Sequence, residues 1–156
     1  INYLKGFYNS TIMASPPGIF DIMGPVMVGP SSSHTAGALR IGASVFAKIG
    51  DDLKRAHIVL YNSFADTGEG HGTVFAIVAG LLGLDTFNPK IKKSHDIAWL
   101  SGVEIDFERA YDESKHPNST MIIAQKYSGE TFVGYGESIG GGAITFKDLS
   151  VQRPTE

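Results

Sequence analysis

The segment 72–84 contains no charged residue and is apolar on nearly every side when drawn as a helix. A helix of this kind is stable in water only if other elements cover it all round. We therefore predict a central buried helix with a sheet or further helices packed around it. The chain has 156 residues, 42% of them apolar, so one domain can bury such a core.

The segments around this helix predict both strands and further helices. Residues 103–108 alternate apolar and acidic side chains, which indicates a strand with one wet face, and Ser128-Gly129 is typical of a hairpin turn. Residues 62–70 have the glycines of a loop. Strands are predicted from three signals: a high content of β-branched residues, alternation of apolar and polar residues, or a place beside the hairpin turn. The predicted strands are 56–61, 103–108, 121–127, 131–135 and 143–146.

Two more helices are predicted, at 31–49 and 89–100. In the first, Gly37 and Gly42 allow close approach, Gly50 ends the helix, and one apolar face is formed by Leu39, Ala43, Phe46 and Ile49. In the second, Pro89 suits the first turn, and the inner residues are expected to be Ile91, Ile97 and Leu100.

The sum is an α+β (mixed α/β) fold, a single domain with a mainly antiparallel or mixed sheet packed by helices. We expect the domain to span residues 18–150, after a tail at 1–17 of natural or artificial origin and before the start of a linker at 151–156.

Charge and cysteine content exclude several classes of function. The chain has 13 Lys plus Arg against 16 Asp plus Glu, without the basic patch of a nucleic-acid binder. It has no cysteine, so it offers neither a thiolate nucleophile nor cysteine ligands for an iron–sulfur cluster. Because no stretch is long and apolar enough to span a membrane, we expect a soluble, cytoplasmic protein.

Ser31, Ser32, Ser33, His34 and Thr35 stand together at a predicted helix start. Backbone N–H groups at such a start favour an anion, for example the carboxylate of an amino acid. The alternative is an ordinary N-cap, for which a single serine would suffice.

A second motif, 67–73, places His71 between glycines. Its imidazole could transfer a proton at the α-carbon of an amino acid, and the alternative is a flexible turn.

Two further polar motifs lie near predicted strands. In the motif 116–120, Asn118 can orient a substrate amine or carboxylate, or the motif is only a structural turn. In the run 138–142, exposed amides could bind an anion or pack against a partner chain, or form a plain loop. We interpret His57 and His95 as structural or surface residues.

In order along the chain, FDIMGPVMVGPSSSHTAG, GHGT with AIVAGLLG, DTF, HPN and SIGGG resemble the beta chain of iron–sulfur L-serine dehydratases. The resemblance covers residues 20–149. It implies conversion of L-serine to pyruvate and ammonia without pyridoxal phosphate, a step of amino-acid degradation and gluconeogenesis. It also implies a [4Fe–4S] cluster whose open iron takes the substrate hydroxyl, and whose cysteine ligands lie on an alpha chain or domain.

The resemblance further implies a fold like the allosteric substrate-binding domain, with no metal ligand in this chain. By motif, His71 becomes the candidate for proton transfer, and carboxylate binding falls to Ser31, Ser32, Ser33, His34 and Thr35. The rest of the pocket wall would come from Asn118, Ser138, Gly140 and Gly141.

The expected partners are the alpha chain and L-serine, and whether two copies form a homodimer stays open. The chain alone should be inactive. The alternatives are a non-catalytic module that senses serine or forms an interface, and a regulatory domain detached from a dehydrogenase. The choice between serine and threonine as substrate stays open.

Overall fold

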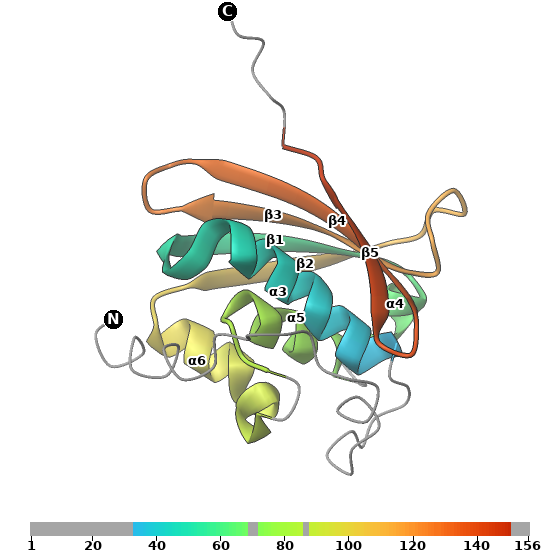
Figure 1. The fold of residues 1–156 in the computed structure, drawn as a ribbon, viewed down its shortest axis with the longest axis horizontal. Coiled ribbons are helices and arrows are strands. Elements are labelled where there is room, and N and C mark those ends of the chain that lie inside the picture. The colour runs from blue at the N-terminus through green and yellow to red at the C-terminus, as the bar shows by residue number, and fades with distance from the viewer. Residues whose placement is uncertain (1–32, 69–71, 86–87, 151–156) are drawn as a thin grey trace, which may run out of the picture.

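The structure, a computed structural model, describes residues 33–68, 72–85 and 88–150 (Figure 1). The expected tail 1–17 and linker 151–156 lie outside these ranges. One layer is a five-stranded sheet in the order β2-β1-β3-β4-β5, and helices α3, α5 and α6 lie together on one side of it (Figure 1). The expected α+β fold with a mixed sheet is confirmed.

All five predicted strands are present. The strands are β1 (Leu53–Asn62), β2 (Glu104–Ala110), β3 (Asn118–Lys126), β4 (Thr131–Gly140) and β5 (Ala143–Asp148). β1 and β2 are parallel, and the other neighbouring pairs are antiparallel. A parallel pair needs a long crossover, which the helices between β1 and β2 supply. The predicted hairpin joins β3 to β4, and Gly129 adopts the positive φ, 91°, that its turn requires.

The helical elements are η1 (Ser33–Gly37), α3 (Ala38–Ile49), η2 (Gly50–Asp52), α4 (Ser63–Thr67), α5 (Thr73–Leu81), η3 (Pro89–Lys93) and α6 (Ser94–Leu100). The prediction of a loop across 62–70 is wrong where α4 forms. Phe64 and Ala65 are fully buried there, and the Thr67 hydroxyl donates to the Ser63 carbonyl at 3.0 Å. Burial in the tertiary fold therefore outweighs the local loop signal.

The predicted buried helix is α5. Its residues from Val74 to Leu81 are buried except Phe75, which is half-buried. α5 packs against α3 through glycines: a β-carbon on Gly80 would lie 2.1 Å from the Leu39 carbonyl oxygen, and one on Gly42 would lie 2.2 Å from that of Ile77. The expected close approach at Gly42 is thus confirmed.

The predicted inner faces of the other helices are only partly right. In α3, Leu39 and Ile49 are buried and Ala43 and Phe46 half-buried, but Ile41 and Val45 also belong to the core. Ile41 meets β4 at Gly136 while Gly42 meets α5, so the sheet and α5 cover different sides of one helix.

In α6 the prediction for Leu100 is wrong, because 71% of this residue is exposed. Ala98 is buried in its place, while Ile91 and Ile97 pack against the core as expected.

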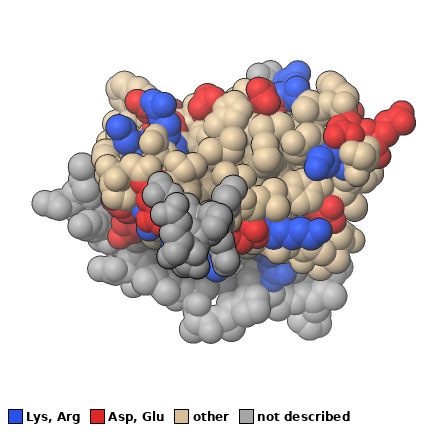
Figure 2. Space-filling model, turned by 90° about the horizontal axis from the view of Figure 1, so that it is seen from above, with Lys and Arg blue, Asp and Glu red and all other residues tan. Residues whose placement is uncertain are grey.

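On the face shown in Figure 2, positive and negative side chains are scattered among uncharged surface. Within the described ranges, none of the helices has the length and apolar character needed to span a bilayer.

Candidate functional site

The π-helical turn η1 contacts elements that carry parts of two other predicted motifs. It contacts α5, β4 and β5, and it begins at Ser33, the last residue of the serine run. π-helical turns occur frequently at functional sites. Nε2 of His34 lies 3.3 Å from the Ser63 hydroxyl oxygen, and the His34 ring lies 5.7 Å from that of Phe64. At the other end of η1, Gly37 lies directly against Ser138.

The 138–142 run crosses the end of β4 and the turn into β5. Its first three residues belong to β4, so the plain-loop alternative does not hold for them, and the β4–β5 register shifts between Ser138 and Gly140. Gly140, Gly141 and Gly142 all have positive φ, of 104°, 61° and 81°. Arg40 of α3 donates from Nη1 to the Gly142 carbonyl at 3.0 Å, so this turn is tied to the helix that follows η1.

The 116–120 motif is held beside α4. The Phe64 N–H donates to the Pro117 carbonyl at 3.3 Å, and Asn118 opens β3 directly opposite Asn62 of β1. The Asn118 N–H donates to Nδ1 of His116 at 3.0 Å, which orients that imidazole. α4 therefore connects the 116–120 motif to His34.

Two buried polar atoms at this site stand out. Within the part of the chain that the structure describes, the Ser138 hydroxyl and the Asn118 side-chain oxygen have no hydrogen-bond partner. Ser138 is only 1% exposed. Buried polar atoms are nearly always paired, and leaving one unpaired costs ~1–3 kcal/mol. A polar ligand would pair both, since a hydroxyl can donate to a carboxylate and an amide oxygen can accept from an ammonium.

Several predicted residues lie outside the described ranges: Ser31, Ser32 and His71. Of the 67–73 motif, the two ends are described. The Thr67 and Thr73 hydroxyls lie 3.0 Å apart, and the Val74 N–H donates to the Gly68 carbonyl at 3.3 Å. Thr35 is half-buried within η1.

Sequence reasoning missed Ser63 and Asn62, because they fell in a segment interpreted as a loop. The available signal was an Asn-Ser pair immediately after a buried strand, since asparagine tolerates positive φ and marks chain reversals.

The two histidines interpreted as structural or surface residues lie elsewhere. His57 of β1 pairs with Asp106 of the neighbouring strand, and its Nε2 lies 3.6 Å from a Glu108 oxygen. His95 of α6 meets the Phe75 ring edge-on at 4.8 Å, and partial burial lowers its pKa.

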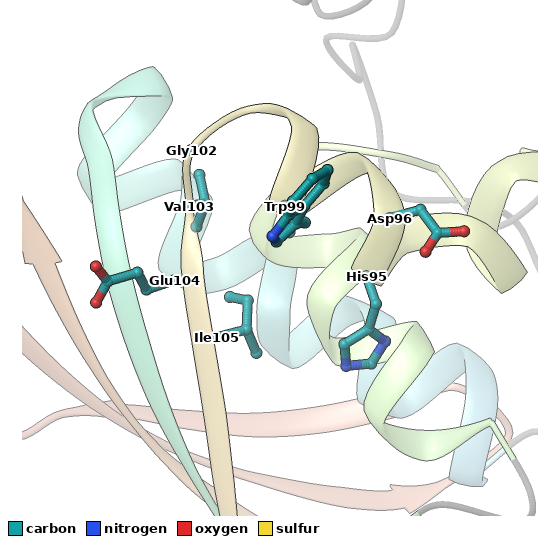
Figure 3. Close-up of a pocket in the computed structure, with 8 residues that line it drawn as sticks. His95, Asp96, Trp99, Gly102, Val103, Glu104 and Ile105 are labelled. Atoms are coloured by element: carbon teal, nitrogen blue, oxygen red, sulfur yellow. The ribbon is translucent and has the colours of Figure 1, made fainter.

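A cavity of about 680 Å³ lies between α6 and β2 and includes none of the predicted site residues. Its lining includes His95, Trp99, Val103 and Ile105, and Figure 3 shows the His95 ring directed toward α5. Among the residues that the structure describes, no group of three or more His, Asp or Glu side chains could hold a metal ion.

The family model described as serine dehydratase beta chain matches residues 18–98. The chain belongs to this family. It is 46% identical over 132 residues to the probable L-serine dehydratase beta chain of Bacillus subtilis, covering 85% of this chain and 60% of that protein. It is 39% identical to the L-serine dehydratase beta chain of Peptoniphilus asaccharolyticus, covering 84% and 60%.

The L-serine dehydratase of Streptomyces coelicolor is 32% identical, over 83% of this chain and 34% of its own length. The chain thus spans 60% of the length of the two beta chains that it matches.

Proposed function

We propose that this chain forms the beta part of an iron–sulfur L-serine dehydratase, a lyase that converts L-serine to pyruvate and ammonia. In this proposal the chain supplies substrate-binding groups to an active site that it shares with an alpha chain or alpha domain. The enzyme acts in the cytoplasm. The observation that carries the proposal is the pair of buried, unpaired oxygens of Ser138 and Asn118 within the motifs of the resemblance. Membership of the serine dehydratase beta chain family supports the choice of ligand.

L-Serine offers a carboxylate, an ammonium group and a β-hydroxyl, and the site has a counterpart for the first two. The Ser138 hydroxyl can donate to the carboxylate. By motif, Ser31, Ser32, Ser33, His34 and Thr35 would bind the same carboxylate. The Asn118 oxygen can accept from the ammonium group. The amides of Gly140, at the end of β4, and of Gly141, in the turn that follows, would complete the wall.

Conversion of serine to pyruvate removes the α-proton and the β-hydroxyl, and the resulting aminoacrylate hydrolyses to pyruvate and ammonia. His71 is our candidate for the α-proton transfer, because an imidazole titrates near neutral pH. In the sequence, His71 lies between α4 and α5.

The residues of this chain do not fit a [4Fe–4S] site of their own, because the sequence has no cysteine. An alpha chain would hold the cluster and supply a Lewis acid for the departing hydroxyl. This chain's part is to bind and orient the amino acid and to handle its α-proton.

The test is anaerobic, serine-dependent pyruvate formation by this chain alone and after mixing with a cluster-loaded alpha chain from the same source. The proposal predicts pyruvate only from the mixture. A stable complex that forms no pyruvate from L-serine contradicts it.

A serine-sensing or interface module is the second candidate, since unpaired polar atoms can bind an amino acid without reacting. His71→Ala in the assembled pair separates the two. Loss of kcat supports a catalytic beta subunit, whereas a change confined to affinity or regulation supports the module.

A further inference from the structure

Asn62 has a backbone conformation that residues other than glycine rarely adopt. Its φ is 50° and its ψ is −114°, and it is the one non-glycine residue with positive φ among those that the structure describes. Such a conformation persists only where the surroundings hold it. Residues in sparsely populated regions of this kind cluster at functional sites.

Three hydrogen bonds from the Asn62 side chain hold this conformation. Its Nδ2 donates to the carbonyls of Asp112 at 2.8 Å and Lys115 at 3.2 Å, and its Oδ1 accepts from the Asp112 N–H at 2.9 Å. The side chain thereby ties the end of β1 to the loop before Asn118. Asparagine supplies both the amide donors and the acceptor that this arrangement needs.

The chain turns at Asn62 directly into α4, and the next two residues both contact His34. The Ser63 hydroxyl lies 3.3 Å from Nε2 of His34, and the Phe64 ring lies 5.7 Å from the His34 ring. Phe64 is fully buried and its N–H donates to the Pro117 carbonyl, so α4 has little freedom to move.

We infer that Asn62 and Ser63 are positioning residues, which set the orientation and tautomer of the His34 imidazole through α4. When Ser63 donates to Nε2, the ring proton of neutral His34 is on Nδ1, as the partner of one ring nitrogen fixes the state of the other. The two residues act on the site through His34 and the 116–120 motif. Only the role of His34 in substrate binding rests on the proposed function; its positioning by Ser63 does not.

The first test is the 15N spectrum of the histidine side chains in the full chain. Ser63→Ala is expected to shift the His34 Nε2 signal, while Ser63→Thr, which keeps a hydroxyl, retains the native signal. The signals of His57 and His95, which lie away from this site, should not move, which makes them internal controls for folding. Unchanged His34 signals in Ser63→Ala overturn the inference.

Asn62 is tested with two substitutions. Asn62→Gly accepts the backbone conformation and loses the three side-chain hydrogen bonds, whereas Asn62→Ala loses the bonds and also strains the backbone. We expect both to disturb the His34 signals, Asn62→Ala more strongly. Native His34 signals in Asn62→Gly would show that the side-chain bonds do not position His34.

In the assembled enzyme, Ser63→Ala should raise KM for L-serine about fivefold, as expected for one net hydrogen bond, and Ser63→Thr should restore it. A KM unchanged by Ser63→Ala contradicts a positioning role in that enzyme. If the unsubstituted pair forms no pyruvate, the proposed function fails, and the His34 spectra still decide whether Ser63 positions this ring.

Discussion

A β-carbon on Gly37 would lie 2.0 Å from the hydroxyl oxygen of Ser138 and 2.7 Å from its Cβ. η1 and β4 therefore touch because position 37 has no side chain. Gly37→Ala should push Ser138 away from η1 and lower the free energy of unfolding by ~1–3 kcal/mol, the usual cost of overpacking. Urea unfolding followed by circular dichroism measures this loss.

The matched control for this substitution is the double variant Gly37→Ala with Ser138→Gly, compared with Ser138→Gly alone. Ser138→Gly removes both atoms nearest to the added β-carbon, so Gly37→Ala should cost much less in that background. Equal losses in the two backgrounds would mean that Ser138 is not what Gly37 accommodates.

The contact between α3 and α5 should tolerate an added β-carbon less well than the contact between Gly37 and Ser138. A β-carbon on Gly42 or Gly80 would meet backbone atoms of the other helix, which no side-chain deletion can relieve. Alanine at either position should therefore lower stability by more than 1 kcal/mol, despite its better helix propensity of ~1 kcal/mol. Ala47→Gly on the exposed side of α3 measures the propensity term alone. A stabilising Gly42→Ala would contradict the observed packing.

The sequence was a good guide to the strands and to α5. Their signals, alternation and continuous apolar character, follow directly from what each element buries. It failed for α4, where a five-residue helix is formed by burial of Phe64 rather than by local preference. It also failed for Leu100, because the spacing of apolar residues along a helix does not show at which residue the helix stops packing against the core.

For the candidate site, the sequence supplied the motifs but not the contacts between them. The contact between Gly37 and Ser138 depends on the sheet register and on the packing of α3 against β4. No local sequence pattern encodes either of these. Ser63 and Asn62 were missed because their roles come from contacts with His34 and Asp112, far away in the sequence.

The pH dependence of stability should contain a contribution from His95. Desolvation lowers its pKa in the folded chain, so the unfolded chain takes up this proton at a higher pH. The unfolded state then gains protons first, and stability falls as the pH drops below the ordinary histidine pKa of ~6.5 toward the folded value. Urea midpoints between about pH 7.5 and pH 5 should decline less steeply in His95→Leu. Identical slopes in the two proteins would count against this assignment.

Ser138 should show opposite effects on stability and on function. Its hydroxyl is buried without a partner, so Ser138→Ala should leave the free energy of unfolding of this chain unchanged or raise it by up to ~1 kcal/mol. A clear loss of stability, measured by thermal unfolding, would mean that the hydroxyl has a structural partner. Thr145→Ala is the comparison, because it removes an exposed hydroxyl on the neighbouring strand that binds Glu137.

The most direct test of a serine-binding beta part is KM for L-serine of the anaerobically assembled pair, with and without Ser138→Ala. Loss of a hydrogen bond to a carboxylate should raise KM roughly tenfold or more, whereas Thr145→Ala should leave it unchanged. An unaltered KM in the Ser138→Ala pair, or a rise equal to that of Thr145→Ala, would contradict the proposal that this site binds the substrate.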